Sequence, residues 1–287
     1  MNAGQWHRVT IVGCGLIGSS FALAMKSADS GVRLAGWDES PSVLDEARRR
    51  NIIDEVDSSF AEGRVSSSDL VYLAMPVREI ISFLRERGGQ VKPGAVITDA
   101  GSTKEKVCDA ARERLPKDRR FVGGHPIAGS HLRGPAHARA ELFREAAYVL
   151  TTDEGSTDRQ ALKAIRETLH LLGARVTLMT AREHDRAMAL VSHLPQLVSS
   201  ALASLIRDEH DADALMSLAG AGYRDWARLS GSSWGVWRDI LATNPAQIAS
   251  ALDGLTERLA AVSRELRADA ARDGDDLSAT RAMFKEL

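Results

Sequence analysis

A glycine hexad close to the N-terminus, Gly13-Cys14-Gly15-Leu16-Ile17-Gly18, constrains the fold more than any other feature of the chain. It follows an apolar strand candidate at 8–12 and opens a helix candidate at 18–27, which is the context that a dinucleotide-binding G-x-G-x-x-G motif requires. The first glycine allows a tight turn, the second lets a pyrophosphate approach the backbone, and the third lets helix and strand pack closely. We therefore expect a cofactor phosphate site at Gly13, Gly15, Leu16, Ile17 and Gly18.

Short apolar runs alternate with helix-like segments over the first 180 residues, a pattern typical of β-α-β units. The expected strands are 8–12, 32–37, 69–74, 95–99, 121–123, 147–151 and 175–179. From residue 181 the pattern is almost wholly helical, and one apolar stripe steps by four and three through Ile248, Leu252, Leu255, Leu259, Val262 and Leu266. The sequence predicts an α/β Rossmann-type domain with a mostly parallel sheet at 1–180 and an all-α domain at 181–287.

The acidic residue after the second strand bears on the choice of cofactor. Asp38 follows Gly18 by twenty residues, where a carboxylate can accept hydrogen bonds from the adenosine ribose and repel a 2′-phosphate. This position favours NAD over NADP; the alternative is that Asp38 only caps the helix beginning at Pro41. We expect the end of the next strand, at Ala74 and Pro76, to contact the same cofactor.

Charge and cysteine content exclude several classes of protein. The net charge of −2 gives no reason to expect nucleic acid or an anionic membrane as a partner. The chain has two cysteines, Cys14 and Cys108, and we expect no disulfide framework. Residues 1–8 lack the apolar core of a signal peptide. No His/Cys cluster has the spacing of a zinc site, so we expect no metal. We expect a soluble, cytoplasmic protein.

One uncharged stretch has the length of a membrane span. No charged residue occurs between Arg186 and Arg207. The stretch nevertheless contains His193, Pro195, Gln196 and four serines, which a lone lipid-facing helix would tolerate poorly. We expect a helix that is buried in protein and crosses the subunit interface of a homodimer.

Polar candidates for chemistry occur in both halves of the chain. Segments 99–104 (DAGSTK) and 124–130 (GHPIAGS) follow late strands, where ligands bind in open parallel sheets. His125 in the second segment either faces a cleft or is structural. In the helical half, His184-Asp185, the pair His193 and Gln196 on one helix face, and the arginines of 222–228 either cap neighbouring helices or line a pocket for an anion.

Taken together, the segments GCGLIGSS, DAGSTK, GGHPIAGS, HDRAMALVSHLPQ, YRDWARLS and WRDI resemble the prephenate dehydrogenase family, which includes arogenate and cyclohexadienyl dehydrogenases of tyrosine biosynthesis. The resemblance covers roughly residues 8–250 in order. It implies a Rossmann domain followed by a helical domain that dimerises. It also implies NAD-dependent oxidation and decarboxylation of a cyclohexadienyl carboxylate, with prephenate converted to 4-hydroxyphenylpyruvate.

The resemblance also implies roles for individual residues. His125 matches the catalytic histidine, which accepts the hydroxyl proton while hydride leaves, and Ser102 matches a serine that hydrogen-bonds near it. His193 matches a histidine near the substrate. Arg228 matches the arginine that holds a substrate carboxylate, and we prefer it to Arg224, whose neighbour Asp225 suggests an ion pair.

Two positions depart from the family's pattern and bear on the substrate. Gln196 stands where members often have a histidine, and His131, beside Ser130 in the predicted substrate loop, stands where they often have an acidic residue. A cationic or neutral group at His131 suits the two carboxylates of prephenate better than the ammonium of arogenate. Arogenate, or an amino-substituted prephenate, remains the alternative substrate.

Two further alternatives make different predictions. β-Hydroxyacid dehydrogenases share the expected architecture but generally use a lysine on the helical domain, and residues 181–250 contain none. A non-catalytic NAD-binding sensor would bind the cofactor without turnover and would be indifferent to loss of His125.

Overall fold

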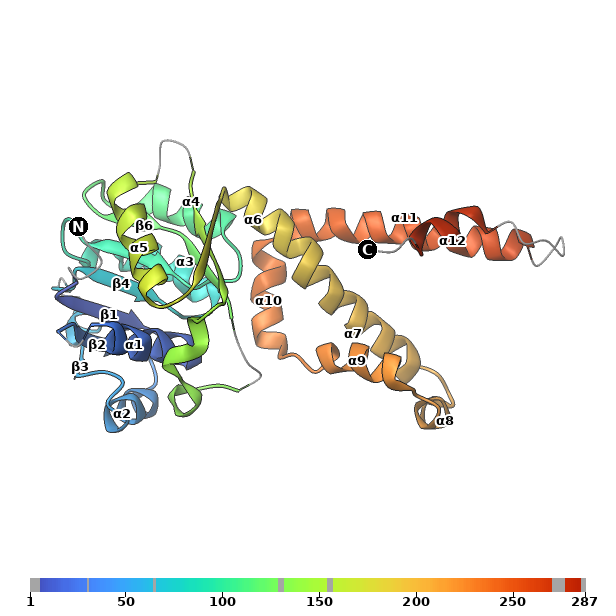
Figure 1. Cartoon of the computed structure of the whole chain (residues 1–287), viewed down its shortest axis with the longest axis horizontal. Coiled ribbons are helices and arrows are strands. Elements are labelled where there is room, and N and C mark those ends of the chain that lie inside the picture. The colour runs from blue at the N-terminus through green and yellow to red at the C-terminus, as the bar shows by residue number, and fades with distance from the viewer. Residues whose placement is uncertain are drawn as a thin grey trace. The chain divides into compact units, whose positions relative to one another are not determined.

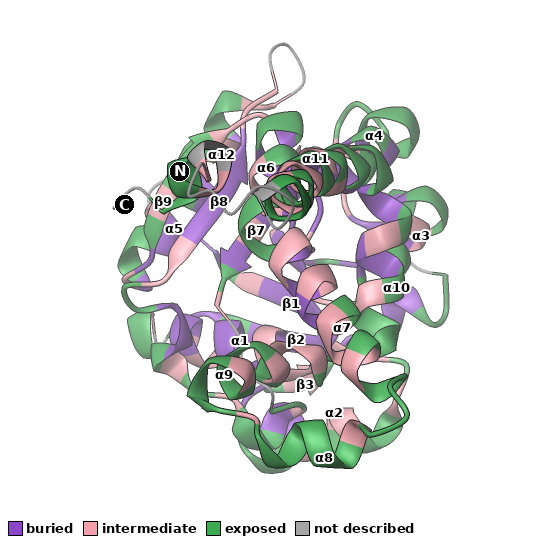
Figure 2. Cartoon of the chain, turned by 90° about the vertical axis from the view of Figure 1, so that its right-hand side faces the viewer, coloured by how far each residue is buried: buried purple, intermediate pink, exposed green. Residues whose placement is uncertain are grey.

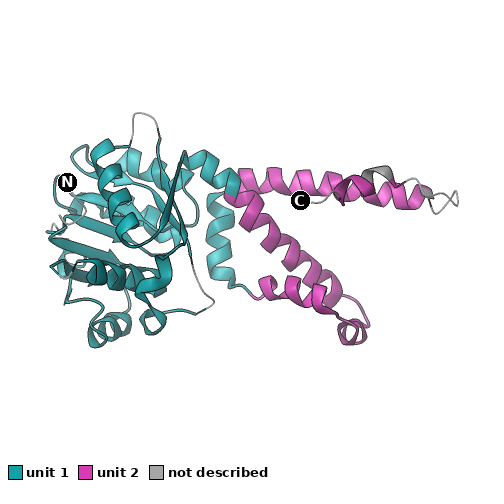
Figure 3. Ribbon diagram, in the orientation of Figure 1, with its two compact units in different colours: residues 1–187, 232–244 teal, residues 188–231, 245–287 magenta. Residues whose placement is uncertain are grey.

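The computed structural model describes residues 6–29, 31–63, 66–128, 132–153, 157–269 and 277–284. The chain divides into two compact units (Figure 3). The first unit contains residues 1–187 and 232–244, and the second contains 188–231 and 245–287. Helix α10 (Trp234–Thr243), although late in the sequence, therefore belongs to the first unit.

The first unit is built on a six-stranded parallel sheet in the order β3-β2-β1-β4-β5-β6 (Figure 1). The strand order reverses between β1 and β4, which is the point where doubly wound sheets bind dinucleotides. The strands are β1 (Arg8–Val12), β2 (Arg33–Trp37), β3 (Glu55–Val56), β4 (Leu70–Leu73), β5 (Val96–Asp99) and β6 (Arg120–Val122). This arrangement confirms the Rossmann-type prediction.

Both faces of this sheet are buried, because alternate side chains of each strand point to opposite sides. On β4, Tyr72 enters a core with Phe21 and Phe143, whereas Leu73 enters a second core with Ile80. Phe21 stacks on Tyr72 with ring centroids 3.9 Å apart. The covering helices are α1 (Leu16–Ala28), α2 (Pro41–Arg49), α3 (Val77–Glu86), α4 (Glu105–Arg114) and α5 (Arg159–Leu171).

A second, three-stranded sheet completes the first unit. Strand β7 (Gly124–Ile127) runs antiparallel to β8 (Ala147–Thr151), and β8 runs parallel to β9 (Arg175–Met179). The expectation that residues 124–130 follow a strand is wrong for 124–127, which are themselves a strand. The two neighbouring glycines and Pro126 are typical of a loop, but pairing with β8 overrides that local preference.

The second unit is entirely helical over its described residues. Its elements are a π-helical segment (Ala189–His193), α7 (Leu194–Arg207), α8 (Ala212–Ser217), α9 (Ala221–Ser230), α11 (Pro245–Asp269) and α12 (Ser278–Met283), and α6 (Ala181–Met188) leads into it. Pro195 explains the π-helical segment, because it lacks the amide hydrogen that an α-helix would direct at residue 191.

Most residues of this second unit are exposed or half-buried (Figure 2), and large apolar residues are among the exposed ones. No residue of α8 or α9 is buried, and Leu259 on α11 is 55% exposed. Among the described residues, the continuous helix Ala181–Arg207 is long and apolar enough to cross a membrane, with 22% of its most apolar window buried. The single chain alone thus does not bury this helix as the sequence analysis expected.

Candidate functional site

The glycine hexad forms the turn after β1 and the first residues of α1. Gly13 has φ +91°, and a Cβ atom there would lie 2.7 Å from the carbonyl oxygen of Ala74. A Cβ atom at Gly18 would collide with the carbonyl of Gly13 and with Ile11. A Cβ atom at Gly15, by contrast, would meet nothing within 4 Å. The open position is therefore the one where a pyrophosphate needs to approach, at the N-terminus of α1.

Asp38 connects the end of β2 to this turn. Its carboxylate accepts hydrogen bonds from the backbone N–H of Cys14 at 2.9 Å and of Ser40 at 2.9 Å. Asp38 also lines a pocket of about 410 Å³ together with Gly13, Gly15, Ala74 and Pro76. Five of the predicted cofactor residues thus surround one cavity. Leu16, Ile17 and Gly18 belong to the first turn of α1 and are not part of its lining.

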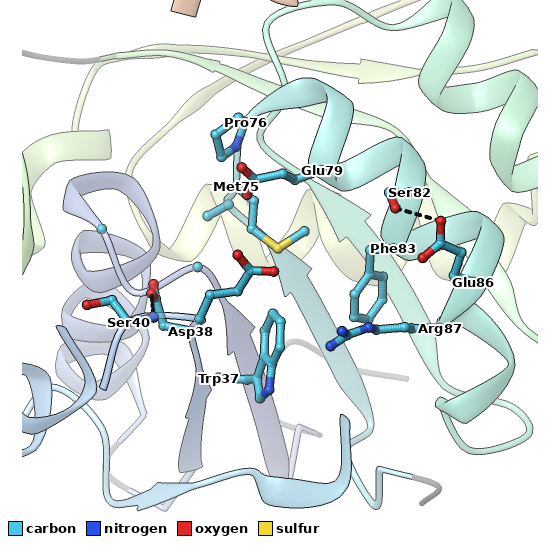
Figure 4. Close-up of a pocket in the computed structure, with 14 residues that line it drawn as sticks. Trp37, Asp38, Ser40, Met75, Pro76, Glu79, Ser82, Phe83, Glu86 and Arg87 are labelled. Carbon is cyan, nitrogen blue, oxygen red and sulfur yellow. Dashed lines mark hydrogen bonds between the residues drawn. The ribbon is translucent and has the colours of Figure 1, made fainter. Parts of the chain in front are cut away.

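The rest of the pocket was not predicted from the sequence. Its wall contains the aromatic rings of Trp37 and Phe83 and the guanidinium of Arg87, whose central carbon lies 4.9 Å from the centroid of the Trp37 ring (Figure 4). Glu79 faces the same space, and burial together with the nearby carboxylates raises its pKa. An aromatic residue directly before Asp38 was the one available signal. The position of Arg87, fifty residues later, depends on how α3 packs.

His125 is the first member of a chain of hydrogen bonds. Its Nδ1 lies 2.8 Å from Nε2 of His184 on α6, and Nδ1 of His184 lies 2.8 Å from Oδ1 of Asp185. His184 and Asp185 are fully buried, whereas His125 is half-buried. His184-Asp185 stood among the polar candidates of the sequence, but its link to His125 across 59 residues could not be read from spacing.

The protonation states along this chain follow from its ends. Burial lowers the pKa of His184 although the hydrogen bond to Asp185 opposes that shift, and the positive charge of Lys104 lowers it further. Neutral His184 donates its Nδ1–H to the Asp185 carboxylate, so its Nε2 accepts the Nδ1–H of His125. The acceptor lone pair of His125 is then on Nε2. The geometry selects the tautomer that a general base needs.

The other residues predicted near His125 are only partly placed. Ser102 lies half-buried in the loop between β5 and α4, and it makes no hydrogen bond to His125 within the described part of the chain. His184 is bonded to this imidazole, and the role of Ser102 near His125 stays a prediction. Ser130 and His131 lie outside the described residues.

In the second unit, Gln196 and Ser199 on α7 hold α9 in place. The Gln196 amide donates to the carbonyl of Leu229 at 2.7 Å, and the Ser199 hydroxyl donates to the carbonyl of Trp226 at 2.5 Å. His193, at the end of the π-helical segment, is 1% exposed. Gln196 therefore fixes the backbone next to Arg228.

The two arginines of α9 differ in their partners. Arg224 donates to the carbonyl of Ala219 at 2.8 Å and forms no ion pair with Asp225 in the described structure, which corrects the ion pair suggested by their adjacency. Arg228 is exposed, and no hydrogen bond or ion pair joins it to another residue among those described. Its guanidinium is thus available to an anionic ligand.

Residues 21–178 match the family described as prephenate dehydrogenase, nucleotide-binding domain, and residues 180–283 match its dimerization domain. The first match begins beyond the glycine hexad, so the interpretation of that motif depends on its own geometry. Both halves of the chain match successive domains of a single family.

Named proteins from bacteria are similar over most of the chain. A prephenate dehydrogenase of Bacillus subtilis is 38% identical over 85% of this chain, which spans 66% of the length of that relative. A cyclohexadienyl dehydrogenase of Zymomonas mobilis is 33% identical, with 95% of this chain and 92% of that protein covered. The crystal structure of a prephenate dehydrogenase from A. aeolicus, in complex with hydroxyphenyl propionate and NAD+, superposes with a TM-score of 0.85 at 30% identity, covering 93% of each chain.

Proposed function

Because the chain belongs to the prephenate dehydrogenase family, we propose that it catalyses the NAD-dependent oxidative decarboxylation of prephenate to 4-hydroxyphenylpyruvate, a step of tyrosine biosynthesis. The observation that carries this proposal is the hydrogen-bonded chain from His125 to Asp185, which gives a half-buried imidazole the tautomer of a general base. Residues 1–180 serve the cofactor, and residues 181–287 serve the substrate and the dimer.

The pocket at the glycine turn fits NAD. The open face of Gly15 and the N–H groups at the start of α1 suit the pyrophosphate, and Asp38 suits the adenosine ribose. Trp37 and Arg87 offer a flat, partly cationic surface for the adenine ring. Bound NAD would supply the acceptor for the hydride that leaves the ring carbon bearing the hydroxyl group.

His125 takes the hydroxyl proton of the substrate on Nε2. The imidazolium that results keeps its Nδ1–H directed at His184, whose own Nδ1–H is held by the Asp185 carboxylate. The buried Asp185 carboxylate, at the other end of this hydrogen-bonded chain, stabilises the positive charge on His125. Preorganised polar groups in a poorly solvated site act in this way. Base catalysis of this kind contributes about 10²–10⁴ in rate. Loss of CO₂ then makes the ring aromatic and the step irreversible.

The cation proposed to bind the substrate carboxylate, Arg228, comes from the helical part of the chain. Arg228 is exposed and unpaired among the described residues, and its planar guanidinium binds a carboxylate through two parallel hydrogen bonds. We also assign His193, Gln196, Ser102, Ser130 and His131 to substrate binding. A positive or neutral side chain at His131 favours the dicarboxylate prephenate over arogenate.

The exposed apolar surface of the helical unit suits a second copy of the chain. Residues 180–283 match a family domain described as a dimerization domain, and the helix Ala181–Arg207 carries exposed Leu190, Val191 and Leu205. The same helix contains the buried His193 and Gln196, and polar groups of this kind are costly in lipid. We therefore propose a homodimer in the cytoplasm in which a partner subunit, and not a membrane, covers this helix.

The test is to mix the protein with NAD and prephenate and to follow NADH absorbance. We expect NADH to form, and His125→Asn to lower kcat by about 10²–10⁴ while NAD affinity stays within about twofold. His170→Asn, on the exposed end of α5, is the matched control and should leave kcat unchanged.

Three results would change the assignment. A higher initial rate on arogenate than on prephenate would move the substrate to the amino analogue. Binding of NAD without turnover of either compound would indicate a sensor. Near-normal turnover by His125→Asn would remove the role of this histidine as the base.

A further inference from the structure

A wholly buried lysine lies behind the proposed base. Lys104 directly precedes α4, and its ammonium is 0% exposed. It is paired with the equally buried carboxylate of Asp99 at the end of β5. Two buried ions of this kind contribute little net stability, because desolvation offsets most of their attraction. Folding alone therefore gives a weak reason for this ion pair.

The ion pair holds both sides of one residue, Gly124. The Lys104 ammonium donates to the carbonyl oxygen of Gly124 at 2.7 Å, and Asp99 Oδ1 accepts from the Gly124 N–H at 2.9 Å. Gly124 begins β7 and directly precedes His125. A Cβ atom at Gly124 would lie 2.6 Å from the Asp99 carbonyl, so the backbone approaches the pair closely. The position of the His125 backbone is thus set by Lys104 and Asp99.

The backbone of Lys104 holds the other end of the same chain. Its N–H donates to Asp185 Oδ1 at 2.7 Å, and the N–H of Glu105 donates to Oδ2 at 2.9 Å. These are amide groups at the N-terminus of α4, where a carboxylate is favoured. Asp185 Oδ1 is also the atom that accepts from His184. One residue therefore contacts the elements that bear the first and the last member of the chain.

We propose that Lys104, through its ion pair with Asp99, is a positioning residue for the dehydrogenase reaction: it fixes the distance between His125 and Asp185 so that His184 closes the hydrogen-bonded chain between them. The inference depends on the proposed function, because it assumes that His125 is the base. Nothing in it requires Lys104 to touch substrate or cofactor.

The charge of Lys104 adds an electrostatic effect to this geometry. His184 is faced by Asp99 from the end of β5, by Lys104 from the loop after β5, by His125 from β7, and by Asp185 from its own helix. The Lys104 ammonium lowers the pKa of His184 in addition to burial. Without it, His184 would take up a proton at higher pH, and a protonated His184 donates from both nitrogens and cannot accept from His125.

Lys104→Met alone would leave the Asp99 carboxylate buried without a counter-ion. It is therefore compared with the double variant Asp99→Asn/Lys104→Met, which removes both charges. Lys106→Met, two residues further along and exposed at its ammonium group, is the matched control. For each protein we would measure NAD affinity, kcat and KM for prephenate, and the pH dependence of kcat. Nitrogen NMR of the histidine rings, without substrate, would report the tautomer of His125.

In the double variant we expect unchanged NAD affinity, a KM within about threefold of wild type, and kcat lower by about 10–100-fold. The acid limb of the kcat profile should move to higher pH in Lys104→Met, and by less in the double variant, because Asp99 raises the pKa of His184 and its loss offsets part of the loss of Lys104. His125 should lose its single Nδ1–H tautomer in both variants. Lys106→Met should resemble the wild type in every measurement.

Wild-type kcat, acid limb and ring tautomer in the folded double variant would overturn the inference. So would loss of NAD binding in parallel with activity, since that outcome indicates a residue needed only for folding. If the wild type made no NADH from prephenate, the proposed function would fail separately. The ring tautomer would still test whether Lys104 positions His125.

Discussion

The two units of the chain treat their polar site residues differently. In the first unit Asp38 is bonded to the glycine turn, and His125 is bonded to His184. In the second unit Arg228 is exposed and makes no such bond among the described residues. The apolar residues follow the same division. Phe21 is 1% exposed within its core, whereas Leu259 is 55% exposed on α11.

Asp38 and His125 thus act within hydrogen bonds that their own unit supplies, whereas Arg228 and Leu259 are exposed to a ligand or to the proposed second subunit. A substitution in the first unit disturbs both a ligand contact and the hydrogen bonds that hold the site, so its effects on folding and on activity are coupled. Loss of an exposed side chain of the second unit, such as Arg228 or Leu259, should remove a contact with a ligand or with the proposed second subunit and leave the unit's own packing nearly intact. The following experiments compare one kind of residue with the other.

The largest contrast should come from truncating one apolar side chain in each unit. Phe21→Ala empties a close-packed site against Tyr72 and should lower the free energy of unfolding of the first unit by about 3–5 kcal/mol. Leu259→Ala removes an exposed side chain and should change it by less than about 0.5 kcal/mol. The urea midpoint for loss of NAD binding measures the first unit specifically.

Leu259→Ala should instead weaken self-association, measured by sedimentation over a range of concentrations. If both variants shifted the urea midpoint equally, truncating Leu259 in the helical unit would destabilise the first unit as much as truncating Phe21 within its own core does. An unchanged association constant would place the subunit interface away from Leu259.

The same contrast explains how much could be predicted from the sequence. The glycine hexad and the alternation of apolar residues are local signals that meet their partners within a few dozen residues. They predicted the Rossmann-type sheet and pointed to five residues that line a single pocket. The bonds between His125 and His184, and the stacking of Arg87 on Trp37, depend on where helices dock on the sheet. No spacing in the sequence encodes them.

Some local signals were themselves misleading. Gly123, Gly124 and Pro126 are typical of a loop, yet the segment pairs with β8 as a strand because tertiary pairing outweighs weak propensity. The adjacency of Arg224 and Asp225 suggested an ion pair, but neighbouring side chains on a helix point in different directions, and Arg224 bonds to a carbonyl. In the second unit, moreover, the pattern of apolar residues indicates helices without indicating what covers them.

The next contrast concerns the two arginines of α9. Arg228→Ala should raise KM for prephenate by about 10–100-fold, since hydrogen bonds to a charged group are worth about 1.5–3 kcal/mol and each 1.4 kcal/mol is a factor of ten. Arg224→Ala, its matched control one turn earlier, loses a bond to the Ala219 carbonyl and should change KM by less than about threefold. Steady-state kinetics at saturating NAD give both values.

Stability should hardly respond to the loss of Arg228, because no described residue depends on it. A KM that stays at the wild-type value would assign the substrate carboxylate to another cation. An equal rise in both variants would indicate that α9 as a whole has moved.

The smallest effect should come from Asp38, whose carboxylate serves both the cofactor and the protein. Asp38→Ser keeps a hydroxyl that can accept from the Cys14 N–H but removes the charge that repels a 2′-phosphate, so the preference for NAD over NADP in kcat/KM should fall by about tenfold. Glu39→Gln, an exposed neighbour in the same pocket, is the control, because solvent screens its charge and the preference should change by less than about threefold. If Asp38→Ser kept the wild-type preference for NAD and lost only stability, the bonds to Cys14 and Ser40 would be the entire role of Asp38. Even a residue that lines the pocket would then serve the fold of the first unit and not the ligand.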